Sequence, residues 1–468
     1  MAERLPCGFV FGFSLDTFCF GILGSPGPVR GRDVTAPPFC DQEWSRPGIS
    51  PVGIHPWNGH VNLLLPQAIW KQERLSRVPS RIAFVTSTPL NVIGGSGTYV
   101  GISLLAQALK QRSVRVEIES PTWWSPSYTI KRILFNFLVA PRLRRRQYDW
   151  IVGFDLDGFH YGRRKNAPYI ASIKGVIADE LRNERGHVRA LLAIQAAFER
   201  LAVRRADVVV ATSLYSRAKI VEAYSVPESK IVIVPELIDF QSWTEGTARA
   251  ATTEGVPPAV LTVAHMYPRK NLGVLMRAYA HLQGAGVPFQ GWVVGEGPCR
   301  KTWERLSDDL HLGDRVTFLG TISRRDLVDR YRRAAIFCLP SRQEGFGIVF
   351  LEAMACGKPI VAARAAAVPE TVADSETGLL VEPDDPEGLA RALASLLSDP
   401  ARRNAMGRAG RQRAERYRAD RVAEHFLTTI GAALEGLETS RRQVSMAADV
   451  SPAPSRQRTE KAGVRGGP

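Results

Sequence analysis

The chain has 468 residues, 45% of them hydrophobic and 23% charged, which is typical of a soluble globular protein and too long for one ordinary domain. Lysine and arginine exceed aspartate and glutamate by 61 − 46 = 15, so the surface is expected to attract phosphorylated small molecules, anionic lipid or nucleic acid. The six cysteines form no CxxC pair and no ligand spacing with histidine. This pattern argues against a structural zinc site or a secreted disulfide framework and favours a cytoplasmic protein with reduced thiols.

The first eighty residues show no sustained periodicity. Residues 8–23 are apolar, but Asp16 interrupts them, and the stretch is shorter than the roughly twenty residues of a membrane span. No convincing signal-peptide cleavage site follows. Residues 1–80 are therefore predicted to be a disordered extension or the product of a wrongly assigned start codon.

A regular alternation of strands and helices begins at residue 81. The apolar run 81–89 is predicted to be a buried strand, followed by a glycine-rich loop at 94–97 and a helix. Further strands are predicted at 114–120, 148–154, 167–175, 206–213 and 230–236. Strands that alternate with helices predict an α/β domain with a parallel, doubly wound sheet, so a Rossmann-like domain is expected over 81–250.

The alternation restarts after the polar linker 242–258, and a second Rossmann-like domain is predicted over 258–418. A helix is expected over 419–437, with the first domain as a surface on which it can pack back. The polar stretch 438–468 contains Pro and Gly and is predicted to be disordered. Two doubly wound domains place the carboxyl ends of their strands around a shared cleft, which favours an enzyme over a scaffold.

Two glutamates flank a glycine turn at the end of a predicted strand, in the segment 341–355. Glu344 precedes the helix, and Glu352 lies just over one turn inside it, so both carboxylates can reach one ligand bound over the helix start. The glycines let the backbone approach that ligand, and the first N–H groups of the helix can bind an anion. A glutamate in a first helical turn also stabilises the helix dipole alone, so one glutamate would be weak evidence.

The segment E-x7-E within E-G-F-G-x-x-x-x-E-A-M-A-x-G-x-P resembles the retaining glycosyltransferases of family 4, which have the GT-B fold of two Rossmann-like domains facing a cleft. The resemblance covers about residues 81 to 435 and is strongest in the second domain. Further matching segments are Pro89 to Gly97, Pro268 to Asn271, Gly295 to Pro298 and Val316 to Gly320.

The resemblance implies a role for each matching position. Lys270 would neutralise the donor diphosphate, Glu352 would bind the ribose hydroxyls, and Glu344 would bind the hydroxyls of the transferred sugar. The implied donor-binding positions are Gly95, His265, Lys270, Glu344, Gly347, Ile348, Val349 and Glu352, with Glu344 and Lys270 as the catalytic positions. The implied reaction moves a sugar from a nucleotide sugar to a glycan, lipid-linked or small-molecule acceptor with retention of configuration, as in hexosyltransferases, with no cofactor and no metal.

Four places in the sequence depart from the family pattern. His265 stands where an arginine usually precedes the Pro-x-Lys segment, so the charge there depends on pH. Lys174 stands where a reaction-centre histidine usually precedes glycine. Glu236-Leu237 replaces the usual Asn-Gly, and Ala366-Ala367 replaces the usual Gly-Gly. Lys174 is expected either to contact phosphate or acceptor, or to be a solvated residue at a strand end.

Asp155 and Asp157 follow a predicted strand and match a short D-x-D pattern that can hold Mg²⁺ or Mn²⁺. Because the second domain indicates the GT-B fold, we expect these acids at the acceptor side of the cleft, together with Lys174, rather than around a metal.

Residues 123–146 combine aromatic residues with six lysines and arginines and no acid. This pattern suits an anionic membrane surface and would place the protein at the inner face of a membrane. A solvated helix with an apolar stripe facing the core fits the same pattern.

Two other functions are compatible with parts of the sequence. The net charge allows a nucleic-acid-binding protein, but the basic residues are dispersed and no nucleic-acid-binding motif is present, so no specific nucleic acid is expected. A GT-B sugar-nucleotide epimerase is the second enzymatic alternative, and the E-x7-E segment with Lys270 favours transfer over it.

Overall fold

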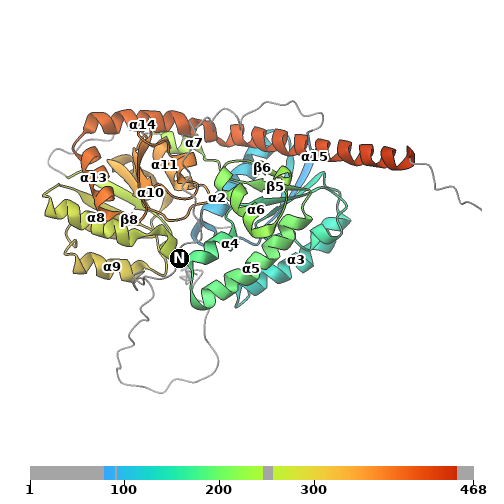
Figure 1. Ribbon diagram of the computed structural model, residues 1–468, viewed down its shortest axis with the longest axis horizontal. Helices are drawn as coiled ribbons and strands as arrows, with labels where there is room; N and C mark the ends of the chain where they lie inside the picture. Colours follow the sequence, from blue (N-terminus) through green and yellow to red (C-terminus); the bar gives the residue numbers. More distant parts are fainter. Residues whose placement is uncertain (1–77, 90–91, 246–256, 451–468) are drawn as a thin grey trace, which may run out of the picture.

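The computed structural model describes residues 78–89, 92–245 and 257–450 (Figure 1). Residues 1–77 of the predicted N-terminal extension and residues 451–468 of the predicted tail lie outside the described residues. Within the described part, two parallel six-stranded sheets are each covered by helices, which confirms the predicted two-domain α/β fold.

The first sheet has the strand order β2-β1-β3-β4-β5-β6, with every pairing parallel. Its strands are β1 (Arg81–Val85), β2 (Arg115–Glu119), β3 (Trp150–Phe154), β4 (Tyr169–Ile173), β5 (Val208–Ala211) and β6 (Ile231–Ile233). The helices that cross between them are α2 (Val92–Gln111), α3 (Tyr128–Arg145), α4 (Ile177–Glu180), α5 (Gly186–Arg205) and α6 (Leu214–Tyr224). The central strands β3, β4 and β5 are buried throughout because helices cover both faces, as parallel sheets require.

The second sheet has the order β12-β11-β10-β7-β8-β9 and is also parallel. Its strands are β7 (Ala259–Val263), β8 (Gln290–Val294), β9 (Val316–Gly320), β10 (Ile336–Leu339), β11 (Ile360–Ala363) and β12 (Gly378–Val381). The helices after α6 are α7 (Phe240–Thr244), α8 (Leu272–Gly284), α9 (Arg300–Asp309), α10 (Arg324–Arg333), α11 (Ile348–Ala355), α12 (Val368–Thr371), α13 (Pro386–Leu397) and α14 (Pro400–Ala414).

The last helix, α15 (Ala419–Val450), leaves the second domain and packs on the first (Figure 1). Val422, Phe426 and Ile430 are buried in the same cluster as residues of β1 and β3. The helix does not end at residue 437 as predicted but runs to Val450. Its polar composition suggested disorder, yet residues 438–450 contain no proline or glycine, and the first helix breaker is Pro452.

The start of α2 and the length of the helices bear on two further predictions. The glycine-rich segment 94–97, predicted as a loop, belongs to the first turns of α2, which begins at Val92. None of the helices in the described ranges is long and apolar enough to cross a bilayer.

Candidate active site

Lys270 and Glu344 are 74 positions apart in the sequence of the second domain and meet in the structure. Lys270 ends the 3-10 turn Pro268–Lys270 after β7, and Glu344 lies between β10 and α11. The Nζ atom of Lys270 is 2.7 Å from Oε1 of Glu344, which also accepts a hydrogen bond of 2.8 Å from the Ser341 hydroxyl. Both charged side chains are about nine-tenths buried, so the pair is a preformed polar site rather than a surface ion pair.

The charges around Glu344 keep it ionised. Burial raises the pKa of the Glu344 carboxyl, but Lys270 and Arg269 outweigh burial and hold its pKa below the usual value. Burial in turn lowers the pKa of Lys270. Arg269, which the sequence analysis did not single out, lies next to Lys270 in the chain and faces Glu180 of the first domain, with 3.5 Å between Nη2 and Oε1. Its position beside Lys270 in the Pro-Arg-Lys segment is the signal that could have identified it.

His265 lies near the same two cations. Burial, Lys270 and Arg269 together lower the pKa of His265, so its imidazole is neutral at pH 7. The permanent positive charge at this place therefore comes from Arg269 and not from the histidine that stands at the expected arginine position.

Glu352 lies in α11 and has different partners from those of Glu344. Its Oε2 atom accepts a hydrogen bond of 3.0 Å from the Tyr331 hydroxyl, and Nη1 of Arg324 is 3.9 Å from Oε1. Burial raises the pKa of Glu352 to about 7. No contact joins Glu352 directly to Glu344 or Lys270 among the interactions of the described residues.

The turn between the two glutamates depends on Gly347. Its φ of +87° is left-handed, and a Cβ atom there would lie 2.5 Å from the Phe350 ring, so a side chain would be strained. Ile348 and Val349 open α11, and the first N–H groups of a helix have no carbonyl partner within it. The main chain at these three positions can therefore bind an anion. Gly95, the expected donor contact of the first domain, lies in the first turn of α2.

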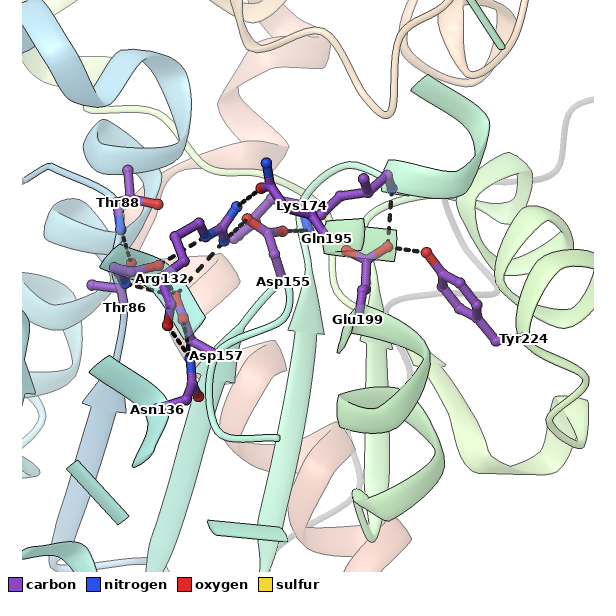
Figure 2. Close-up of polar contacts among 12 residues, drawn as sticks. Thr86, Thr88, Arg132, Asn136, Asp155, Asp157, Lys174, Gln195, Glu199 and Tyr224 are labelled. Carbon is purple, nitrogen blue, oxygen red and sulfur yellow. Dashed lines mark hydrogen bonds and ion pairs between the residues drawn. The ribbon is translucent and has the colours of Figure 1, made fainter. Parts of the chain in front are cut away.

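A buried polar network lies at the carboxyl end of the first sheet (Figure 2). Asp157 is fully buried and accepts hydrogen bonds from the backbone and hydroxyl of Ser87 and from Asn136. Arg132 lies with Nη2 at 3.7 Å from both Asp155 and Asp157. Of the two predicted acceptor-side acids, only Asp155 keeps a partly exposed carboxylate, and burial raises its pKa to about 6.

These contacts explain the D-x-D pattern in structural terms. Both oxygens of Asp157 are occupied by protein hydrogen bonds, so this acid holds β1 and α3 together. In the described part of the chain, no group of three or more His, Cys, Asp or Glu residues could hold a metal ion.

Lys174 follows β4 and forms an ion pair with Glu236, which follows β6. The Nζ and Oε1 atoms are 2.9 Å apart. The backbone N–H of Lys174 donates to Oδ1 of Asp155 over 3.0 Å. The structure thus links two of the three predicted acceptor-side residues, Asp155 and Lys174.

The loop that carries Glu344 also contacts the first domain. The carbonyl oxygen of Gly345 accepts hydrogen bonds from the hydroxyl groups of Thr212, Ser213 and Ser216 at 2.8 to 3.1 Å. These residues lie between β5 and the first turn of α6. The two domains therefore meet at the residue that follows Glu344.

Two family models match successive parts of the chain. The model described as Glycosyltransferase Family 4 matches residues 96–242, and the model described as Glycosyl transferases group 1 matches residues 247–413. The junction between the two matches falls at the linker between the two sheets.

Two curated relatives have the same kind of name. A GDP-mannose-dependent alpha-(1-6)-phosphatidylinositol monomannoside mannosyltransferase of Mycolicibacterium smegmatis is 36% identical over 228 residues, which cover 45% of this chain and 59% of the relative. A D-inositol 3-phosphate glycosyltransferase of Segniliparus rotundus is 34% identical over 242 residues, which cover 50% of this chain and 54% of the relative. The chain thus spans somewhat more than half the length of these relatives.

Solved structures have the same fold. A sucrose-phosphate synthase of Thermosynechococcus elongatus matches with a TM-score of 0.60 and 22% identity, covering 79% of this chain and all of that one. WaaG, a glycosyltransferase involved in lipopolysaccharide biosynthesis, matches with a TM-score of 0.59 and 21% identity, covering 74% of this chain and 99% of that one. At these identities the likeness establishes the two-domain architecture.

Proposed function

Because the chain belongs to the glycosyltransferases of family 4 with the GT-B fold, we propose that it transfers a sugar from a nucleotide sugar to a hydroxyl group of an acceptor, with retention of configuration. The observation that carries this proposal is the Lys270–Glu344 pair beside the N-terminus of α11. Lys270, Arg269 and the helix N–H groups supply the positive charge that a departing diphosphate needs, and the ionised Glu344 can accept hydrogen bonds from sugar hydroxyls.

GDP-mannose is the first donor to test. The Mycolicibacterium relative is named as GDP-mannose-dependent, and its acceptor is a phosphatidylinositol mannoside. We propose the same donor class and a glycolipid acceptor for this chain. The reaction needs no metal in this proposal, because the cations named above stand where a metal would otherwise neutralise the diphosphate.

A thermal-shift panel of UDP-, GDP- and ADP-sugars tests the donor site. We expect one donor to raise the melting temperature, as mass action requires for a ligand that binds only the folded state. Glu344→Ala and Glu352→Ala should remove this shift, whereas the exposed Glu376→Ala should keep it. A wild-type protein that responds to no donor would overturn the proposal. Proton NMR of the product, compared with the donor, tests retention, and the appearance of an epimerised nucleotide sugar without an acceptor would favour the epimerase instead.

The exposed face of α3 supports a second part of the proposal, peripheral binding to an anionic membrane. Ile130, Leu134, Phe137 and Leu138 lie on one face of α3 and are between 45% and 55% exposed. Helix α5 lies beside α3 (Figure 1) and adds Leu191 and Ile194, which are also exposed. The buried face of α3 is formed by other residues, so this stripe is additional to the one that packs on the core.

Basic residues near the end of α3 suit an anionic lipid surface. Arg142 and Arg145 are exposed, whereas Arg144 donates to main-chain carbonyls and Arg146 pairs with Glu117 and Glu119. The charges of Arg142 and Arg145 are therefore the ones available to an anionic lipid surface. Apolar side chains beside basic ones fit the boundary of a lipid bilayer. We propose that this face holds the enzyme on the cytoplasmic face of a membrane that contains its acceptor.

Flotation with phosphatidylcholine vesicles, with and without phosphatidylglycerol, tests this part. The wild type should float only with the anionic vesicles, and less at high salt. Leu134→Ser with Leu138→Ser, and separately Arg142→Glu with Arg145→Glu, should abolish flotation. Leu437→Ser, at an exposed leucine of α15, is the matched control and should float as the wild type does. Equal flotation of all variants would contradict the proposal.

A further inference from the structure

Two departures from the family pattern meet in space. Lys174 and Glu236 are 62 positions apart in the sequence and follow strands β4 and β6, which are separated by β5. Their charged groups nevertheless lie 2.9 Å apart, with each side chain about nine-tenths buried. Lys174 and Glu236 therefore form a buried ion pair at the carboxyl end of the first sheet.

The main chain at Lys174 lies beside the loop that carries Glu344. A Cβ atom on Gly345, the residue after Glu344, would lie 2.9 Å from the carbonyl oxygen of Lys174 and 3.8 Å from Cα of Gly175. The main chain at Lys174 thus contacts the loop whose Glu344 we assign to the transferred sugar. The hydrogen bond from the Lys174 N–H to Asp155 fixes this main chain from the other side (Figure 2).

The Glu236 carboxylate is only half satisfied. Its Oε1 atom holds Lys174, whereas Oε2 is buried and has no hydrogen-bond partner among the described residues. Gly101 of α2 leaves room for this oxygen, since a Cβ atom there would lie 2.8 Å from it. Burying an ion pair costs desolvation, and leaving one oxygen unpaired adds to that cost. Such an arrangement is expected where function rather than stability selects the residues.

We propose that Lys174 and Glu236 act as one unit at the reaction centre, in which Lys174 donates a hydrogen bond to an oxygen of the transferred sugar and Glu236 holds the ammonium group in position. This inference rests on the proposed function. An ammonium group has three N–H donors, of which Glu236 takes one, so two remain for a substrate. Glu236 acts through Lys174 and is a positioning residue.

A neutral double variant, Lys174→Met with Glu236→Gln, separates this role from a structural one. Replacing both members of a buried pair leaves no uncompensated charge, so the melting temperature should stay close to that of the wild type. The affinity for the nucleoside diphosphate, measured by calorimetry, should stay within about twofold, because the unit contacts the sugar and not the diphosphate. The kcat should fall by about 100-fold or more, as for other preorganised donors. Glu236→Gln alone should lower kcat while leaving KM nearly unchanged.

A second ion pair of the same sheet provides the control. Lys165 and Asp207 are 2.7 Å apart and lie before β4 and β5, at the opposite edge of the sheet. Lys165→Met should leave kcat and diphosphate affinity unchanged. Lys174→Arg keeps the positive charge and tests the site again should the double variant fail to fold; it should retain more activity than Lys174→Met.

Each outcome decides the matter. A double variant that turns over like the wild type would reduce the pair to a structural contact. A double variant that loses diphosphate affinity as strongly as kcat would move Lys174 from the sugar to the phosphates and overturn the assignment. A wild type that neither binds nor turns over any nucleotide sugar would instead contradict the proposed function, and this inference with it.

Discussion

At the scale of single residues, the second domain holds two glutamates in opposite electrostatic states. Lys270 and Arg269 surround Glu344 and hold its pKa down, whereas burial raises the pKa of Glu352 to about 7. The sequence presents both simply as members of one motif. Their different neighbours suit different tasks, because Glu344 is a fixed anion and Glu352 can change charge near neutral pH.

Glu344→Gln should destabilise the ligand-free protein. The substitution leaves Lys270 without its buried counter-charge, although the amide oxygen can still accept hydrogen bonds. We expect a loss of about 2 kcal/mol in the free energy of unfolding, below the full cost of breaking a buried pair. Urea denaturation measures it, and Glu376→Gln at an exposed position is the control. A loss no larger than that of the control would show that the pair adds nothing to stability.

Glu352 should make stability depend on pH. Its pKa of about 7 in the folded chain is above the usual value of 4.5, so the folded state keeps a proton that the unfolded state has lost. The contribution of Glu352 to the free energy of unfolding therefore falls as pH rises from 4.5 through 7. Glu352→Gln removes the cost of ionising this buried carboxyl. Between pH 5 and pH 8, the free energy of unfolding of the variant should rise relative to that of the wild type by at most about 3 kcal/mol. Identical pH profiles of the two proteins in urea denaturation would refute this.

At the scale of elements, α15 connects the end of the chain to the first domain. Phe426 is 1% exposed and packs against Phe84 and Trp150, with ring centroids 6.5 Å apart in each case. The last helix is therefore part of the first domain's core, although it follows the second domain in the sequence.

Phe426→Ala should lower the free energy of unfolding by about 3 to 5 kcal/mol, because a large buried ring is lost and a cavity remains. Leu437→Ala, at a leucine of the same helix that is 37% exposed, should cost less than about 0.5 kcal/mol. Calorimetric or urea unfolding distinguishes the two. Equal losses would mean that α15 does not contribute to the core in solution.

At the scale of the whole molecule, polar contacts around the loop that carries Glu344 join the two domains. Both oxygens of Glu370 accept hydrogen bonds of 2.7 Å from the backbone N–H groups of Leu214 and Tyr215, at the first turn of α6. Gln343 donates to Asp179 of the first domain over 3.2 Å. These contacts join the two domains in the structure, and polar contacts of this kind can open and reform.

Glu370→Ala should therefore shift the molecule toward a more open arrangement. The substitution leaves two N–H groups of α6 without their partner and removes a contact between the domains. Small-angle X-ray scattering should show a larger radius of gyration than for the wild type, and a bound nucleotide sugar should reduce the difference. Glu376→Ala, on the surface of the second domain, is the control and should scatter as the wild type does. An unchanged radius in Glu370→Ala would mean that Glu370 does not hold the domains together.

The sequence by itself determined the alternation of strands and helices, and with it the two parallel sheets. Short apolar runs flanked by turn residues are a local signal, and the E-x7-E segment is a local motif. The family models confirm the family, and the solved structures confirm the fold. Composition was less reliable at the end of the chain, where polar residues without a helix breaker continue α15.

Only the tertiary structure decided which charges face each other. Lys174 and Glu236 are far apart in the sequence and come together because parallel strands end at the same edge of a sheet. The burial of Asp157, the exposed face of α3 and the cation Arg269 likewise depend on how helices and loops pack on those strands. Local patterns report the periodicity of one segment, whereas pKa and pairing depend on charges and burial supplied by several segments at once.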